Sequence, residues 1–261
     1  MLLIIEALLL ILAALGQDHR AAAGQKYPLD MALNSVDDQY MGCREQMANL
    51  VKTYYLKKEI SNSAKYKMSW QLGEKFVKFP KGHLTRNHLI AIYVYSDSNV
   101  YHHFNPDTRY GKNQYKQMTY KWYSLHFLLT EAMQILKKAQ NQCRVTYRGT
   151  TAEFNKYVLN KEIRFGSFTS SSLDRNVARG FGSKSCFEIY TCESADVSIY
   201  SKYPNEREVL IPPYEKFKVT AVRTRKYQQS LWCDTVFTLK SSGKLSYQNC
   251  AVAFKKPSKY Y

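Results

Sequence analysis

Several common signatures of function are missing from this sequence. It contains no Asn-x-Ser/Thr sequon, so N-linked sugars are not expected. After the first fifteen residues, no stretch approaches the roughly 18 apolar residues of a membrane-spanning helix. The G-x-S-x-G turn of serine hydrolases is absent, and Gly180 and Gly182 lack the third glycine of a dinucleotide fingerprint. These absences exclude a multi-span membrane protein and give no support to an α/β-hydrolase or a Rossmann domain.

The cysteines lack the spacing of a zinc site. The only close pair, Cys186 and Cys192, has no second close pair of Cys or His to complete a tetrahedron, and we expect no metal. An even number of cysteines behind a secretory leader instead favours disulfides, whose connectivity the sequence leaves open. Buried free thiols remain the alternative for Cys186 and Cys233. All six lie at positions 43, 143, 186, 192, 233 and 250.

The N-terminal run MLLIIEALLLILAAL has the length of a secretory h-region and precedes Gly16. We predict a signal peptide over residues 1–16, extending to about 23. Glu6 interrupts the run and no Lys or Arg precedes it, so a short buried or interfacial helix is the alternative. Residues 253–261 form a short basic tail without the spacer and hydrophobic end of a lipid-anchor signal. We therefore expect a secreted, extracellular protein with no membrane anchor.

The 261 residues carry 38 Lys and Arg against 21 Asp and Glu, a formal charge of +17. Such a field attracts nucleic acid, anionic membranes, acidic proteins and dinucleotide phosphates alike. The basic residues form no runs of five or more, which favours a solvated basic surface over a groove for a specific nucleic acid. With 22 tyrosines and 12 phenylalanines the chain should fold compactly, and no linker divides residues 29–252, so we expect one domain.

Hydrophobic spacing changes between the two halves of the chain. Residues 41–60 and 121–140 have the period of amphipathic helices, and the second run ends in cationic residues that suit a helix C-terminus. From Cys143 onward, short runs rich in β-branched and aromatic residues alternate with turn residues. No long helical pattern separates most of them. The fold class predicted is α+β, with a helix-rich N-terminal half and a mainly antiparallel sheet.

Three segments carry residues suited to chemistry. Glu206 and Glu208 immediately precede an apolar run; on an extended strand they would share one face, about 7 Å apart. An exposed acidic turn is the structural alternative. Arg148 ends a strand-like run before Gly149, where an arginine fork would suit phosphate, although surface arginines are common at strand ends. Residues 165–172, FGSFTSSS, surround Ser170 and could equally be a polar turn or helix cap.

The order and spacing of these segments decide between the alternatives. An arginine ends a strand, a Ser-x-Ser follows about 22 residues later, and a Glu-x-Glu about 38 residues beyond that. This arrangement resembles the R-S-E pattern of the arginine-specific ecto-mono-ADP-ribosyltransferases of vertebrates. The segments SVDDQYMGC (35–43), VYHHFN (100–105), YPNEREVLIPP (203–213) and SGKLSYQNC (242–250) extend the resemblance over about residues 29–252.

The resemblance implies an enzyme that transfers ADP-ribose from NAD+ to arginine side chains of proteins and releases nicotinamide. Glu208 would hold the ribose 2'-hydroxyl and stabilise an oxocarbenium-like centre, and Glu206 would orient the guanidinium and take its proton. Arg148 would hold NAD+, Gly149 would leave room for the nicotinamide amide, and Ser170 would orient Glu208. NAD+ would be a substrate rather than a bound cofactor, and whether NADP+ also serves stays open.

The same resemblance places Tyr101, Ser167 and Ser201 around the dinucleotide, with Ser167 at a position where relatives often carry Gln. It also implies two disulfides, Cys43 with Cys250 and Cys143 with Cys192, and leaves Cys186 and Cys233 unassigned. We expect a monomer. Two other functions remain to be tested, namely NAD+ hydrolysis by the same fold and an inactive basic protein that binds RNA or anionic membranes. A ribonuclease is disfavoured because no paired catalytic histidines are evident.

Overall fold

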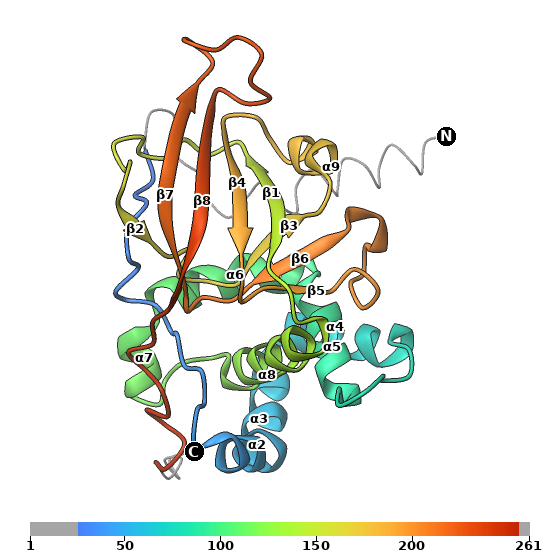
Figure 1. Cartoon of the computed structure of the whole chain (residues 1–261). Coiled ribbons are helices and arrows are strands. Elements are labelled where there is room, and N and C mark those ends of the chain that lie inside the picture. The colour runs from blue at the N-terminus through green and yellow to red at the C-terminus, as the bar shows by residue number, and fades with distance from the viewer. Residues whose placement is uncertain (1–25, 256–261) are drawn as a thin grey trace.

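The computed structural model describes residues 26–255, so the predicted signal peptide and most of the basic tail lie outside the described residues. A layer of helices lies beneath one large twisted sheet (Figure 1). None of the described helices is long and apolar enough to cross a membrane. The helical elements in chain order are α2 (Arg44–Leu50), η1 (Val51–Tyr55), α3 (Leu56–Asn62), α4 (Ala64–Phe76), α5 (Arg86–Tyr95), α6 (Ser98–Tyr110), α7 (Lys112–Lys116), α8 (Tyr123–Gln140), α9 (Arg175–Gly180) and η2 (Pro204–Glu206).

Both predicted helical runs are confirmed. Residues 41–60 form α2 and α3 with the π-helical turn η1 between them. Residues 121–140 form α8, which ends in Lys137 and Lys138 and then at Asn141 in the left-handed conformation. The N-terminus of α8 is capped from a distance by buried Glu59, which accepts hydrogen bonds from the backbone N–H of residues 123 (2.8 Å) and 124 (3.0 Å).

The sheet has eight strands in the order β2-β7-β8-β4-β1-β3-β6-β5. Every pairing is antiparallel except β4 with β8, which confirms the mainly antiparallel prediction. The strands after Cys143 match the predicted runs, and β2, β3 and β5 are additional short strands. Their bounds are β1 (Arg144–Thr150), β2 (Glu162–Ile163), β3 (Thr169–Ser172), β4 (Ser185–Thr191), β5 (Ala195–Asp196), β6 (Glu208–Ile211), β7 (Glu215–Thr224) and β8 (Thr235–Lys244).

Two hydrophobic cores meet at the site-bearing strand β6, through Leu210 and Ile211, and a third, smaller cluster surrounds the Cys186–Cys233 disulfide. The larger core joins the helical layer to the sheet through Phe168 and Leu210. The smaller core packs the strands β4, β7 and β8, where Phe187 and Phe237 stack at 5.1 Å. Phe168 and Leu210 flank Ser170 and Glu208 in the sequence, so burial of these apolar neighbours fixes β3 and β6 against the helices.

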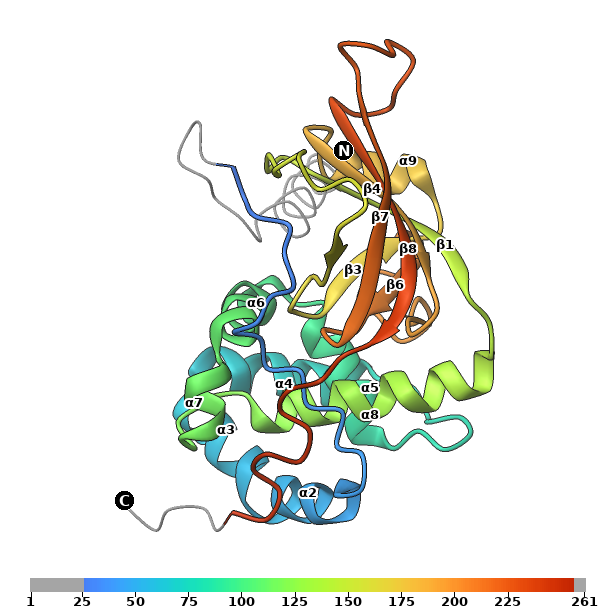
Figure 2. The ribbon, with the colours of Figure 1, turned by 60° about the vertical axis from the view of Figure 1, so that its left-hand side comes forward.

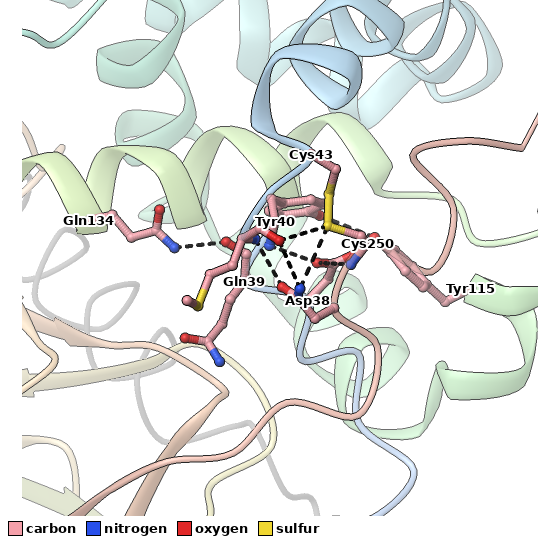
Figure 3. The surroundings of a disulfide bond; sticks show 9 residues. Asp38, Gln39, Tyr40, Cys43, Tyr115, Gln134 and Cys250 are labelled. Carbon is pink, nitrogen blue, oxygen red and sulfur yellow. Dashed lines mark hydrogen bonds between the residues drawn. A yellow bond between two sulfur atoms is a disulfide. The ribbon is translucent and has the colours of Figure 1, made fainter.

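Two segments from opposite ends of the chain lie side by side on the helical layer (Figure 2). Cys43 and Cys250 join them through a disulfide with an S–S distance of 2.03 Å. Asp38 lies beside this bond and accepts from the backbone N–H of Tyr40 (2.7 Å) and Cys250 (2.9 Å) and from the Tyr115 hydroxyl (2.8 Å) (Figure 3). The crosslink and the carboxylate together hold the C-terminal segment against α2.

The remaining cysteines are also paired. Cys143 and Cys192 form the second expected disulfide, between β1 and the end of β4. Cys186 and Cys233 form a third, so the alternative of buried free thiols is wrong for this pair. The third bond fastens the loop between β7 and β8 to β4. Residues 47 apart in sequence meet there because β4 and β8 are parallel neighbours, with Cys186 opposite Val236.

Candidate active site

Three neighbouring strands bring the distant motifs together. In the sheet order, β1, β3 and β6 are adjacent. Ser170 lies opposite Leu210 and Ser172 opposite Glu208 in the antiparallel register. Because side chains alternate along a strand, Ser170 and Glu208 project from the same face of the sheet. Residues 38 apart in sequence therefore meet at one place.

Glu208 is the most enclosed acid of this region, with 4% of its surface exposed. Its Oε1 accepts a 2.6 Å hydrogen bond from the Ser170 hydroxyl. Burial raises the pKa of Glu208, while the hydroxyls of Ser170 and Ser201 and the charge of Arg148 oppose the rise. The carboxylate is thus desolvated yet held by two hydroxyl donors, an arrangement suited to stabilising a cation.

Glu206 does not lie on the strand as predicted. It ends the 3-10 turn η2, and Arg207 adopts the left-handed conformation (φ 49°, ψ 47°) before β6 begins at Glu208. The expectation that both carboxylates share the face of one extended strand is therefore wrong. Two hydrogen bonds fix the turn to β3. The Ser172 hydroxyl donates to the Glu206 carbonyl (2.7 Å), and the backbone N–H of Leu173 donates to the Arg207 carbonyl (3.1 Å).

The Glu206 side chain has no hydrogen-bond partner for its buried Oε1 among the described residues. Burial, together with the negative charge of Glu208, raises its pKa to about 8. A buried acceptor left unsatisfied costs about 1–3 kcal/mol. Such a group is stabilised by a ligand that donates hydrogen bonds or carries positive charge. The acidic-turn alternative does not account for this burial.

The serine-rich segment is a buried strand rather than a polar turn or cap. All four residues of β3 are buried, and their hydroxyls have specific partners. Ser170 donates to Glu208, and Ser171 donates to the Val209 carbonyl at 2.9 Å. Composition suggested a loop because isolated serines favour turns. In the folded protein, hydrogen bonds to β6 and to η2 satisfy these hydroxyls within a strand. Only the tertiary structure supplies those partners.

Arg148 connects β1 to β3 where the two strands separate. Among the described residues, β1 and β3 pair only where Tyr147 lies opposite Ser172. Arg148 is buried at the same point and donates from Nη1 to the Ser170 carbonyl at 2.8 Å. The guanidinium therefore holds the strand that carries Ser170. It is not the exposed strand-end arginine that was the simpler interpretation.

Gly149 is required by close backbone packing. A Cβ at this position would lie 2.3 Å from the Ala178 carbonyl oxygen and 2.4 Å from that of Gly182. Only glycine allows α9 and the turn after it to approach β1 so closely. The role predicted for Gly149, leaving room for the nicotinamide amide, stays a prediction.

Two adjoining pockets meet at Arg148. The first encloses about 260 Å³, part of it open to solvent, and contains the three motif segments. It is lined by Tyr147, Arg148, Gly149, Ser170, Ser171, Ser172, Ala178, Phe181, Glu206 and Glu208. The second, of about 590 Å³, includes Arg148, Ser167, Asn105 and Arg109. An arginine shared between two compartments suits an extended ligand with phosphates between its two ends.

The remaining predicted contacts are placed unequally. Ser167 lines the second pocket. Ser201 is buried behind Glu208, hydrogen-bonds to it, and lies 3.0 Å from the Ser96 hydroxyl. Tyr101 is buried on α6 against the rings of Tyr95 and His102 and lines neither pocket. The structure thus brings Arg148, Gly149, Ser170 and the two glutamates together in one pocket. The contact predicted for Tyr101 stays a prediction.

Sequence reasoning missed the apolar side of the first pocket. Tyr147, Ala178 and Phe181 line it from β1, α9 and the turn after α9. The signal available was the Gly180-Phe-Gly182 segment, whose Gly182 has a φ of 139° and packs on Thr150. Within residues 26–255, no three metal-ligating side chains cluster.

Comparison with known proteins agrees with this geometry. The family model described as ART: NAD:arginine ADP-ribosyltransferase matches residues 29–242. The chain is 38% identical over 232 residues to NAD(P)(+)--arginine ADP-ribosyltransferase 2 of Gallus gallus, covering 85% of this chain and 72% of the relative. It is 35% identical to ecto-ADP-ribosyltransferase 5 of Bos taurus, covering 87% and 75% respectively.

Solved structures show the same fold. The crystal structure of the eukaryotic mono-ADP-ribosyltransferase ART2.2 superposes with a TM-score of 0.71 at 32% identity, covering 85% of this chain and 98% of that one. A mutant of the same protein in complex with NADH matches equally well, with a TM-score of 0.71. By its family model, its relatives and its fold, this chain belongs to the NAD:arginine ADP-ribosyltransferases.

Proposed function

We propose that the protein transfers ADP-ribose from NAD+ to arginine side chains of other proteins and releases nicotinamide. The observation that carries this proposal is the pairing of a buried carboxylate, Glu208, with a half-buried one, Glu206, at one pocket. Glu208 is held by two hydroxyl donors, whereas the Glu206 Oε1 accepts no hydrogen bond from the described residues. The first suits a fixed electrostatic role and the second suits a proton acceptor.

In the proposed reaction, the bond between the ribose C1' and the nicotinamide nitrogen breaks, and its electron pair leaves with neutral nicotinamide. Glu208 stabilises the cationic ribose through the 2'-hydroxyl and its own negative charge. Ser170 and Ser201 keep this carboxylate oriented. A guanidinium nitrogen of the acceptor then bonds to C1', and Glu206 takes the proton that this nitrogen loses. A pKa of about 8 makes Glu206 a competent base near neutral pH.

Arg148 is proposed to bind NAD+ from its position between the two pockets, with Gly149 and Ser167 on either side. Tyr101 and Ser201 complete the proposed contacts, and NADP+ is a second candidate substrate because relatives carry NAD(P)(+) in their names. We also propose that residues 29–252 form one catalytic domain that works outside the cell. Three disulfides fit an oxidising compartment, and several relatives are named ecto-ADP-ribosyltransferases.

The test measures nicotinamide release from NAD+ with and without agmatine, a small guanidine acceptor. The parent protein should form an ADP-ribosyl adduct. Glu208→Gln should lower nicotinamide release by about 10²- to 10³-fold, since it removes the charge opposite the forming cation. Glu206→Gln should lose the adduct while still releasing nicotinamide to water. The exposed Glu45→Gln, on α2, serves as the matched control.

The alternatives predict other outcomes. Release by the parent protein that agmatine neither accelerates nor diverts into an adduct would make it a hydrolase of NAD+. No release at all, with salt-sensitive binding of RNA, would indicate an inactive basic binding protein. Equal activity of Glu208→Gln and the parent would refute the assignment of Glu208.

A further inference from the structure

A third pocket lies next to the proposed acceptor site and is used by none of the steps above. It encloses about 660 Å³, part of it open to solvent. Its walls come from the end of α4, from α5 and from the loop that precedes η2. Figure 1 shows this side of the molecule, where the loop before β6 lies close to α4 and α5. Apolar side chains form most of its lining: Phe76, Val77, Leu89, Tyr93, Ile199 and Tyr200.

The pocket presents apolar surface to solvent. Phe76 is 63% exposed and Ile199 62%, and the Phe76 ring stacks on Tyr93 at 6.1 Å. Phe79, two residues beyond the lining Val77, is 88% exposed. Large apolar side chains on opposite walls of one hollow mark an interaction surface more often than isolated exposed residues do. The hollow can therefore take one apolar side chain of a partner.

The charged side chains that line this pocket are both cationic. Lys78 and Lys202 line it, and no carboxylate belongs to the lining. Lys202 lies 3.7 Å from the buried carboxylate of Asp97 and is partly neutralised. Lys75, in the last turn of α4, and Lys81, in the connection from α4 to α5, are exposed like Lys78. None of these three lysines has a carboxylate within ion-pair distance in the described part of the chain. The rim is complementary to an acidic segment.

The chain segment before β6 connects this pocket to the acceptor side of the active site. Ser201, Lys202 and Pro204 line it. Pro204 opens the 3-10 turn that ends at Glu206, the proposed acceptor base. A peptide whose arginine reaches Glu206 would thus place its neighbouring residues over this pocket. We propose that this pocket selects acceptor proteins, favouring arginines flanked by an apolar side chain and by carboxylates.

This inference rests on the proposed function and refines its substrate class. Binding energy at the pocket acts on the acceptor protein and leaves NAD+ unaffected. It therefore changes kcat/KM for protein acceptors and leaves that for a small guanidine unchanged. Charges at the rim additionally make protein modification sensitive to salt.

The test compares four synthetic peptides that share one arginine and one length. Their flanks are apolar with glutamates, apolar with lysines, polar with glutamates, or neutral and polar. The parent protein should modify the first with kcat/KM roughly ten times that of the second. Lys78→Glu should lower kcat/KM for the first peptide by about 3- to 10-fold, and Phe76→Ala should remove the advantage of the apolar flank.

Agmatine is the internal standard in every assay, and both variants should modify it at the parent rate. Lys57→Glu, an exposed charge reversal on α3, is the matched control and should leave all four peptides unaffected. Equal modification of all peptides by the parent would overturn the inference and leave the transferase function intact. Equal losses toward agmatine and peptides in Lys78→Glu would also overturn it. Failure of the parent to modify agmatine would overturn both proposals.

Discussion

Replacing Ser170 with alanine removes one of the two hydroxyl donors to Glu208 and leaves the carboxylate in place. The hydrogen bond is short (2.6 Å) and buried, and its acceptor is a charged group. Bonds of this kind contribute about 1.5–3 kcal/mol. If the bond tightens fully only when positive charge develops, its loss lowers kcat by about 10- to 150-fold. Ser201 still donates to Glu208, which favours the lower part of this range.

The pH profile separates this role from a structural one. Burial already raises the pKa of Glu208, and the Ser170 hydroxyl lowers it. The active form is the carboxylate, so activity falls as pH drops through this pKa. Removing a donor to the charged form raises the pKa further. The acid limb of kcat should therefore move to higher pH in Ser170→Ala.

The assay is nicotinamide release measured from about pH 4 to about pH 9, a range that covers the titration of ordinary and raised carboxyl groups. Ser171→Ala is the matched control, because it removes a buried hydroxyl of the same strand that donates to the Val209 carbonyl instead. That variant should lose stability while its acid limb stays in place. An unshifted acid limb in Ser170→Ala, or the same shift in both variants, would refute the reasoning.

Glu206→Gln should lower the rate of arginine transfer by about 10²-fold or more and remove the inflection of the pH profile near pH 8. A raised carboxyl pKa lowers the stability of the folded protein as pH rises from the unfolded pKa toward 8, so this variant should be more thermally stable than the parent at pH 9 but not at pH 4. The same stability difference between variant and parent at both pH values would contradict the burial of the carboxylate. Gly149→Ala should displace α9 and lower the free energy of unfolding, measured by chemical denaturation, by about 2 kcal/mol or more, because its Cβ would meet the Ala178 carbonyl oxygen at 2.3 Å. A free energy of unfolding equal to that of the parent would show that α9 moves freely. Replacing Cys43 and Cys250 with serine should lower the free energy of unfolding by up to about 5 kcal/mol, because the bond closes a loop between residues 207 apart; a loss below about 1 kcal/mol would mean that the Asp38 contacts alone hold the C-terminal segment.

Much of the architecture was readable from local pattern. Helical spacing in residues 121–140 and alternating strands after Cys143 are properties of short segments, and burial of their apolar faces determines where they pack. The order and spacing of Arg148, Ser170 and Glu208 likewise identified the family without coordinates. These features depend on residues near in sequence or on a pattern that the whole family shares.

Other features depended on contacts between distant segments. Serines 170 to 172 form a strand because their backbone pairs with β6 and their hydroxyls donate to β6 and η2, and no local signal shows those partners. Glu206 lies in a 3-10 turn because Arg207 adopts a left-handed conformation before β6. The same sequence stretch is compatible with an extended strand.

By itself, the sequence determined the two halves of the fold, predicted the polar residues of the candidate site and, through family resemblance, gave two of the disulfides. The tertiary structure alone decided the third disulfide, the different environments of Glu206 and Glu208, and the basic apolar pocket beside them. The physical reason is desolvation. The pKa of a carboxylate and the partner of a thiol depend on which surfaces fold over them, and the neighbouring residues in the chain do not specify those surfaces.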